Sequence, residues 1–405
     1  MSQLSEIRVC LDIGCHNHRV AIGLDDGTIL NEFDIAHTTE GIKKFFSCVE
    51  QEKNEYGLPI VVAMESFNGH ARPLDKYVLE HGYRLFSVNN HKLARFKEIF
   101  PGPAKTDEID TLKIFELMTL KDTLPLAKDV LQEVREVPVE NQKLKRLSRR
   151  RKILVAEKVQ VTNRLQSDLN SVSPGLTSIT KSVDNKWFLS YLTAKNDFKK
   201  IITMRKSGLS KLPDLGKKYI QIILEWEKTV KLSSDVDWVG DMIIRDAKRV
   251  QELKKEILQL EKQMSELSEE SEIAKKLNSI PGFGTVSIST LAGEIGNIER
   301  FKKESSLALY LGMAPLDNSS GTYKSGKSSK HVNRNAKMAL MIAICRHIEL
   351  VPEIKEYYLK KRQEGKKHNQ AIRSCGRHLV RIMYSMLTKN RDYQLPKEFK
   401  KNITN

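Results

Sequence analysis

Four carboxylates in the first third of the sequence have the types and spacing that a divalent cation needs. Asp12 lies near the end of one apolar run, "IRVCLDIG", and Glu65 closes another, "IVVAME". Asp107 and Asp110 are three residues apart in "AKTDEIDT", so on a helix they share one face. Mg²⁺ prefers carboxylate oxygens, and two such ions stabilise the entering and leaving oxygens of a phosphoryl transfer. The four acids therefore predict a Mg²⁺ site for phosphoryl transfer.

Simpler structural roles remain open for each acid taken alone. Asp107 would complement the dipole at a helix N-terminus, and Asp12 would suit a turn after a strand. Glu65 is harder to explain in this way, because an unpaired carboxylate that follows five apolar residues is costly to bury. The four acids together favour the metal site.

The elements that must position these acids alternate between strand and helix over residues 7–119. Two strands are expected on either side of the turn "DDG", and the run "PIVVAMES" reads as a buried strand. A helix is expected from Thr39, as its N-cap, to a stop at Gly57. This order predicts an α/β domain with a mixed sheet over residues 1–125.

The middle of the chain, residues 126–275, reads as long helices. Seven basic residues fall between Lys143 and Lys152. Apolar residues at spacings of three and four predict a coiled-coil seam, either in an antiparallel hairpin or between subunits: Val250, Leu253, Ile257, Leu260, Met264 and Leu267. The sequence assigns no role to residues 171–240.

The third region, residues 276–395, is predicted to be mostly helical. The stretch "LNSIPGFGTVSISTLAGEI" reads as a helix, a tight turn and a second helix. Gly282 and Gly284 allow backbone N–H groups to converge on one anion. The pattern favours a helix-hairpin-helix that binds DNA phosphates, although a plain turn has the same pattern.

A serine-rich and basic segment, "NSSGTYKSGKSSKHVNRNAK", follows in this region and contains no carboxylate. Residues 321–405 hold 20 Lys and Arg against 6 Asp and Glu, and the whole chain has a net charge of +17. A concentrated excess of this kind suits a polyanion such as nucleic acid, while a solubilising basic surface is the plain alternative.

Other bulk features exclude several classes of protein. The five cysteines are scattered and lack C-x-x-C spacing, which argues against a disulfide framework and a zinc site. No apolar run is long enough for a membrane span, and no signal peptide is evident, so a cytoplasmic protein is expected.

The stretches "CLDIGCHNHRVAI", "VVAMESFNGHARPLDKYVLEHGYRLFSVN" and "PAKTDEIDTLKIFEL" resemble the N-terminal domain of the insertion-sequence one-ten family of transposases. The C-terminal stretch "LNSIPGFGTVSISTLAGEIGNIERFKKESSLALYLGMAPLDNSSG" is similar to that family's second domain. The resemblance covers about half of the chain. It implies an RNase H-like (RuvC-like) fold with a D-E-D-D metal site at Asp12, Glu65, Asp107 and Asp110.

The same resemblance implies a serine nucleophile. The family places it before a glycine and shortly after a "GMAP" turn, which is Ser320 here; Ser319 and Ser325 are the alternatives. Where the family has a glycine before its Asn-Arg pair, this chain has Val332. The surrounding cations are expected to neutralise a phosphate: Lys324, Lys327, Lys330 and Arg334.

Further implications of the resemblance concern partners. Members of the family are recombinases guided by a structured bridge RNA, and they assemble as dimers or tetramers in which the metal site and the serine come from different subunits. Arg149, Arg150 and Arg151 would then contact RNA and DNA backbones.

Four other functions fit parts of the sequence. A RuvC-like junction nuclease would cut without a covalent intermediate. An actin-like kinase needs a second phosphate loop that the sequence lacks, and a non-enzymatic RNA-binding coiled coil leaves the four acids unexplained. The "CHNH" run at 15–18 lacks the distant ligands of an H-N-H nuclease.

Overall fold

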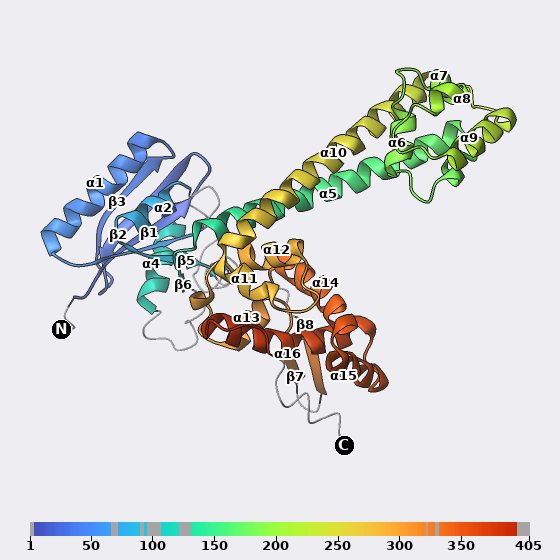
Figure 1. Cartoon of the computed structure of the whole chain (residues 1–405). Helices are drawn as coiled ribbons and strands as arrows, with labels where there is room; N and C mark the ends of the chain where they lie inside the picture. The colour runs from blue at the N-terminus through green and yellow to red at the C-terminus, as the bar shows by residue number, and fades with distance from the viewer. Residues whose placement is uncertain are drawn as a thin grey trace. The chain divides into compact units, whose positions relative to one another are not determined.

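The computed structural model describes residues 4–65, 72–89, 93–94, 107–120, 131–320, 323–328 and 332–394, without the side chains of residues 107–109, 315–320 and 323–328. The chain forms two compact units, Met1–Glu136 and Val137–Asn405 (Figure 1). The division into three domains expected from the sequence stays a prediction.

The first unit contains a mixed sheet with the strand order β3-β2-β1-β4-β5-β6. β1, β4 and β5 run parallel, and the other neighbouring pairs are antiparallel. This confirms the mixed α/β sheet and is compatible with an RNase H-like fold. The strands are β1 (Ile7–Ile13), β2 (Asn17–Leu24), β3 (Ile29–Ala36), β4 (Ile60–Met64), β5 (Arg84–Val88) and β6 (Leu131–Glu133).

Helices pack on both faces of this sheet. α1 (Thr39–Tyr56) and α2 (Leu74–Glu80) bury Phe45 and Val78 against one face, and α4 (Asp107–Leu120) buries Ile114 against the other. The N-cap of α1 is Thr38 and not the neighbouring Thr39, because the Thr38 hydroxyl accepts a hydrogen bond from the Gly41 N–H at 3.1 Å.

The second unit is built on two long helices, α5 (Val139–Val172) and α10 (Val236–Glu270). Ion pairs show that they run antiparallel: Arg164, late in α5, bonds Asp246, and Arg151, earlier in α5, bonds Glu261. Of the predicted seam, Val250, Leu253 and Met264 are buried and Ile257, Leu260 and Leu267 are partly buried within this one chain.

A small helical head joins the far ends of α5 and α10 (Figure 1). Its core contains Phe188 and Tyr191, and Trp187 stacks on Tyr219 with ring centroids 4.3 Å apart. The head is formed by the segment, residues 171–240, to which the sequence assigned no role. Its elements are η2 (Leu176–Ile179), α6 (Lys186–Leu192), α7 (Phe198–Ile202), α8 (Lys206–Leu209) and α9 (Lys217–Thr229).

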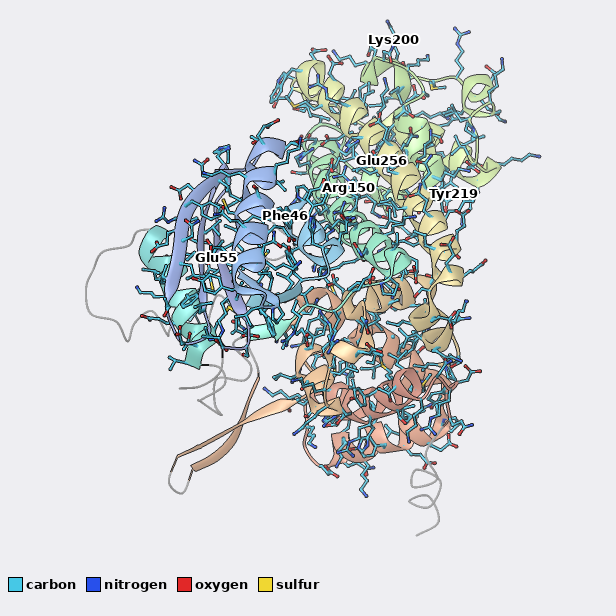
Figure 2. The ribbon with its side chains drawn as sticks, turned by 90° about the vertical axis from the view of Figure 1, so that its left-hand side faces the viewer. Phe46, Glu55, Arg150, Lys200, Tyr219 and Glu256 are labelled. Atoms are coloured by element: carbon cyan, nitrogen blue, oxygen red, sulfur yellow. The ribbon has the colours of Figure 1, made fainter. Side chains whose placement is uncertain are left out.

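At the other end of the long helices lies a helical base with its own apolar core. A two-stranded hairpin, β7 (Pro315–Ser320) and β8 (Tyr323–Ser328), extends away from the helices of this base (Figures 1 and 2). The base comprises α11 (Glu272–Asn278), α12 (Thr285–Ile295), η3 (Ile298–Arg300), α13 (Glu304–Tyr310), α14 (Arg334–Leu350), α15 (Pro352–Gln363) and α16 (His368–Thr388). Within the described ranges, no helix has the length and apolarity that crossing a membrane requires.

Candidate functional site

The first two predicted metal-binding acids lie on neighbouring strands of the sheet. Asp12 is on β1, and Glu65 directly follows β4. The two strands are parallel and pair Leu11 with Met64, so Asp12 and Glu65 are the next residues on each strand. The backbone N–H of Glu65 donates to the carbonyl oxygen of Leu11 at 3.4 Å. The two acids are therefore adjacent at the carboxyl ends of neighbouring strands.

Alternation along the strands assigns both acids to the face that α4 covers. Side chains two residues apart on a strand share a face. Cys10 and Ala63, two residues before the acids, are both buried in the core that α4 completes. Asp12 and Glu65 therefore share this face.

The third acid, Asp110, is on α4 itself. It is one turn before Ile114, which is in the same core, and it is 6% exposed. The guanidinium of Arg8, near the start of β1, donates to the hydroxyl of Thr119 at 3.1 Å. The C-terminal end of α4 is therefore near the start of β1, and its N-terminal turn, with Asp110, lies toward the end of the strand where Asp12 is.

The fourth acid cannot be compared in the same way. Asp107 is the first residue of α4, but its side chain lies outside the described residues. Among the side chains that are described, no three His, Cys, Asp or Glu are grouped closely enough to hold a metal ion. The structure thus brings three of the acids to one edge of one sheet face, while their convergence on a metal stays a prediction.

The predicted nucleophile lies in a β-hairpin. Ser320 is the last residue of β7 and pairs with Tyr323, and Ser319 pairs with Lys324. Backbone pairing gives these polar residues a defined register, which their composition did not indicate. The side chains of Ser320, Lys324 and Lys327 lie outside the described residues, as does Lys330, whereas Arg334 is exposed at the start of α14.

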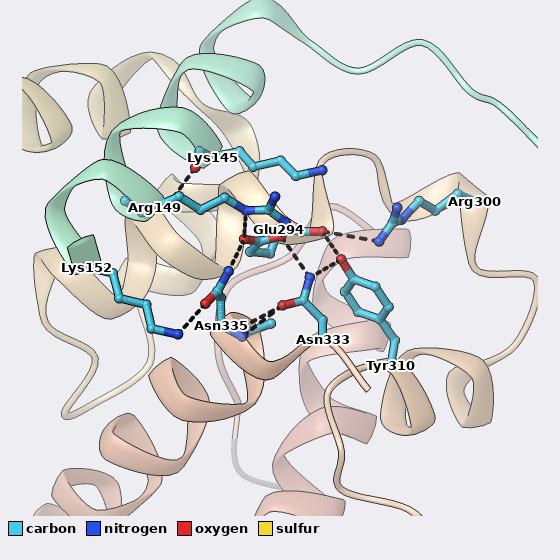
Figure 3. Close-up of polar contacts among 10 residues, drawn as sticks. Lys145, Arg149, Lys152, Glu294, Arg300, Tyr310, Asn333 and Asn335 are labelled. Carbon is cyan, nitrogen blue, oxygen red and sulfur yellow. Dashed lines mark hydrogen bonds and ion pairs between the residues drawn. The ribbon is translucent and has the colours of Figure 1, made fainter. Parts of the chain in front are cut away.

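A buried carboxylate, Glu294 on α12, lies at the centre of a polar network that the sequence analysis missed (Figure 3). Arg149 donates to it through Nε at 2.7 Å and Nη2 at 2.9 Å. Asn333 and Asn335 donate through their side-chain amides at 2.8 and 3.2 Å. The Tyr310 hydroxyl donates to the backbone carbonyl of Glu294 at 2.7 Å.

This network keeps Glu294 charged. Burial alone would raise the pKa of Glu294, but the hydrogen bonds from Arg149 and Asn333 lower the pKa below its ordinary value. In return, the hydrogen bond to Glu294 raises the pKa of Arg149. One sequence signal was available: Glu294 is the one acid in the apolar stretch "VSISTLAGEIG", where an unpaired carboxylate would be costly.

The three arginines predicted to bind nucleic acid differ in their surroundings. Arg149 bonds Glu294, and Arg151 bonds Glu261 at 2.6 Å. Arg150 is exposed on α5 and, among the described residues, forms no ion pair (Figure 2).

The two glycines of the predicted phosphate-binding turn also differ. Gly282 has φ 87°, and a Cβ there would lie 2.7 Å from the backbone nitrogen of His347 on α14. Gly284 is exposed, and a Cβ there would have nothing within 4 Å. A short segment joins α11 to α12, while the helix-hairpin-helix motif and phosphate binding by the turn stay predictions.

Comparisons with known proteins cover both ends of the chain. The model of the DEDD transposases of the IS110 type, described as "Transposase", matches residues 9–174, and the model described as "Transposase IS116/IS110/IS902 family" matches residues 274–359.

Whole-length relatives agree with these models. The chain is 24% identical over 357 residues to the insertion element IS110 uncharacterized 43.6 kDa protein of Streptomyces coelicolor, covering 84% of each chain. It is 23% identical over 409 residues to the IS116 uncharacterized 44.8 kDa protein of Streptomyces clavuligerus, covering 95% of each. The pilin gene-inverting protein of Moraxella bovis is 28% identical over 123 residues, 30% of this chain and 38% of that one. With two family models in the family's order and relatives that span nearly its whole length, this chain belongs to the IS110 family of transposases.

Proposed function

We propose that this transposase cuts and rejoins DNA of an insertion sequence, with Ser320 as the nucleophile and with Asp12, Glu65, Asp107 and Asp110 as ligands of Mg²⁺. The observation that supports the proposal is the register of β1 and β4, which makes Asp12 and Glu65 neighbours at one edge of the sheet, with Asp110 on the helix that packs on this sheet.

The residues present fit a divalent cation by the chemistry of their donors. Asp12, Glu65 and Asp110 offer carboxylate oxygens, the ligands that Mg²⁺ prefers, and they come from two strand ends and one helix of a single fold unit. When bound, the cation would supply positive charge beside the phosphoryl oxygens. We also take the mixed sheet to be RNase H-like, on its strand order and directions.

The serine part of the proposal concerns a single exchange of bonds. The Oγ of Ser320 attacks the phosphorus of a DNA phosphodiester, a P–Oγ bond forms, and the bond from phosphorus to one deoxyribose oxygen breaks. The serine proton passes by way of solvent to the departing sugar oxygen. The strand end stays joined to the protein as a phosphodiester, so a second sugar hydroxyl can later displace the serine and restore the strand.

The cations around the serine complete this part of the proposal. Lys324, Lys327, Lys330 and Arg334 follow Ser320 with no carboxylate between them, and they would offset the charge of the attacked phosphate. Gly282 and Gly284 would contact phosphates further along the DNA, as would Arg150, which is exposed.

The proposed partners rest on the resemblance of the sequence to the family and on the charge of the chain. We propose a structured guide RNA as a second nucleic-acid partner, and an assembly of two or four subunits. The net charge of +17 supports a polyanionic partner without selecting RNA over DNA.

The alternative is a RuvC-like nuclease in which water replaces the serine and no strand is rejoined. One comparison favours the recombinase: a relative is named a pilin gene-inverting protein, and inversion requires that broken strands be rejoined. The two functions differ in whether a protein–DNA adduct forms.

The acid site is tested by Asp12→Asn, assayed for DNA cleavage in Mg²⁺ and, separately, for nucleic-acid binding by gel shift. We expect cleavage to fall at least a hundredfold with binding within about twofold of the unchanged protein. Glu55→Gln is the matched control, since Glu55 is an exposed carboxylate of the same unit on α1, across the sheet from α4. Cleavage at the wild-type rate in Asp12→Asn would disprove the site.

The nucleophile is tested by trapping. After denaturation, the wild-type protein should carry a DNA fragment on the peptide that contains residue 320, and Ser320→Ala should carry none. Ser325→Ala is the control, because Ser325 also precedes a glycine. An adduct on Ser319 or Ser325 moves the assignment, and cleavage without any adduct supports the nuclease.

A further inference from the structure

The serine hairpin is flanked in the chain by two residues that bond each other. β7 begins five residues after Tyr310, the end of α13, and β8 ends five residues before Asn333. The backbone N–H of Asn333 donates to the carbonyl oxygen of Tyr310 at 2.9 Å. The side-chain amide of Asn333 donates to the Tyr310 hydroxyl at 2.6 Å. The chain therefore enters and leaves the hairpin at one fixed point.

Asn333 also fixes this point to the helix that follows. Its side-chain oxygen accepts from the backbone N–H groups of Asn335 and Ala336, each at 3.0 Å, which caps the N-terminus of α14. Each polar atom of the Asn333 side chain is thus engaged: the oxygen by the helix, and the amide hydrogens by Tyr310 and Glu294.

Glu294 joins the two ends of the hairpin to the rest of the unit. Its carboxylate, with a side-chain exposure of 0%, accepts from Asn333 at one end, and its backbone carbonyl accepts from Tyr310 at the other. The same carboxylate accepts two hydrogen bonds from Arg149 of α5. Two parallel bonds from a guanidinium fix the orientation of the carboxylate as well as its charge (Figure 3).

From these contacts we propose that Glu294 is a positioning residue for strand transfer: by bonding both ends of the β7–β8 hairpin and Arg149 of α5, it sets where the hairpin that bears Ser320 stands. The proposal rests on the proposed function in so far as Ser320 is the nucleophile. Glu294 itself does not touch DNA or the reacting atoms in this scheme. Misplacement of a reacting group by about 1 Å costs on the order of a hundredfold in rate, so a positioning residue can have a large effect.

The test exchanges the acid at position 294 with the amide at position 333. Glu294→Gln removes the charge and leaves Arg149 without its carboxylate. Asn333→Asp places a second carboxylate beside Glu294. Combining the two changes restores a single carboxylate and the contact between the two positions, because the new amide at position 294 donates to the new carboxylate at position 333, and aspartate caps a helix as well as asparagine does. The paired hydrogen bonds from Arg149 to position 294 are not restored.

Two measurements are made on the full-length protein: hydrogen exchange of the backbone amides of residues 315–328, and the rate of adduct formation with DNA. We expect each single variant to raise hairpin exchange and to lower the adduct rate at least tenfold. The affinity of each single variant for nucleic acid should stay within about twofold of the wild-type value. The double variant should recover part of the loss in both measurements, because it restores the contact between positions 294 and 333 without the paired bonds from Arg149.

Glu261→Gln is the matched control. Glu261 bonds Arg151, which is two residues from Arg149 on the same helix, but it has no described contact with the hairpin ends. The control should leave hairpin exchange and adduct formation unchanged. If Glu294→Gln does not fold, Tyr310→Phe replaces it, since that change removes only the hydroxyl that bonds Glu294 and Asn333.

Three results would overturn the proposal: wild-type hairpin exchange in Glu294→Gln or in its replacement Tyr310→Phe, equal losses in Glu261→Gln, or a double variant no better than the singles. Failure of the proposed function looks different. In that case the wild-type protein forms no adduct at residue 320, while hairpin exchange still reports whether Glu294 positions the hairpin.

Discussion

Replacing Gly282 by alanine tests whether the turn between α11 and α12 needs its glycine for packing or for binding DNA. Gly282 has φ 87°, in the left-handed region. Its Cα faces the backbone of α14, where an added Cβ would lie 2.7 Å from the nitrogen of His347 and 2.8 Å from the carbonyl carbon of Arg346. These are backbone atoms of a helix, so they cannot move aside as a flexible side chain can.

The expected cost has two parts. A residue with a Cβ in the left-handed region costs about 1–2 kcal/mol. Overpacking in a well-packed interior costs about 1–3 kcal/mol more. We therefore expect Gly282→Ala to lower the free energy of unfolding by about 2–5 kcal/mol.

The assay is urea unfolding followed by far-UV circular dichroism, which reports the helices of the second unit. Gly284→Ala is the matched control, two residues away in the same turn. Gly284 has an ordinary φ of −90°, is exposed, and has nothing within 4 Å of an added Cβ. Its substitution should change stability by no more than about 0.5 kcal/mol.

The reasoning is refuted if Gly282→Ala is as stable as the wild type, or if both variants lose the same stability. DNA affinity then separates the two roles. If the turn binds phosphates, Gly284→Ala weakens binding at unchanged stability, because its Cβ would stand where the DNA backbone approaches.

Two further predictions concern the interior of the second unit. Leu253→Ala should lower the free energy of unfolding by about 2–5 kcal/mol at any protein concentration, because Leu253 is fully buried within one chain. Leu258→Ala is the control, since Leu258 is 67% exposed on the same helix, and it should change the free energy of unfolding by less than about 0.5 kcal/mol. A loss that depends on protein concentration would contradict burial within one chain. Burial lowers the pKa of His347 below 6.5, although the hydrogen bond that it donates to the Pro281 carbonyl oxygen acts in the opposite direction. Neutral His347 therefore contributes fully to the stability of the fold above pH 6.5, and this contribution is lost as the pH falls through the folded-state pKa. Between pH 7 and pH 5, His347→Asn should lose less unfolding free energy than the wild type, by up to about 1.4 kcal/mol for each unit by which the pKa of His347 differs between the folded and unfolded states. Urea unfolding at several pH values measures this, and the same pH dependence in both proteins would contradict the assignment.

The strands and their acids could be predicted from the sequence because the signals are local. The run that ends at Asp12 and the run that ends at Glu65 are both apolar and short, and each forms a strand. Carboxyl ends of parallel strands meet at one edge of a sheet, so acids that follow two such strands become neighbours without further information. The register of β1 and β4 puts Asp12 and Glu65 at neighbouring positions, while their binding of a metal stays a prediction.

The network at Glu294 could not be predicted in this way, because its members are distant in sequence. Arg149 lies 145 residues from Glu294, and Asn333 lies 39 residues away on the other side. No periodic pattern connects a residue of α5, one of α12 and one before α14. The hairpin was missed for a related reason: polar strands without alternation of apolar residues give no signal of period two.

The basic run on α5 shows why counting charges is not enough. Three consecutive residues of an α-helix point in directions about 100° apart, so no single surface receives all of them. Arg149 bonds buried Glu294 and Arg151 bonds Glu261, whereas exposed Arg150 forms no ion pair among the described residues. The same substitution at neighbouring positions should therefore have different effects.

Arg149→Gln should act on stability. It leaves Glu294 buried with only the two asparagine donors, and an incompletely satisfied buried carboxylate costs about 1–3 kcal/mol. Arg150→Gln should leave stability unchanged and weaken nucleic-acid binding, with the slope of log affinity against log salt shallower by about 0.9 if Arg150 contacts one phosphate of duplex DNA. Urea unfolding and binding titrations at several salt concentrations measure the two effects. If Arg149→Gln lost affinity at full stability, its bond to Glu294 would not hold in the working protein, and the surface of α5 would have to be assigned to all three arginines after all.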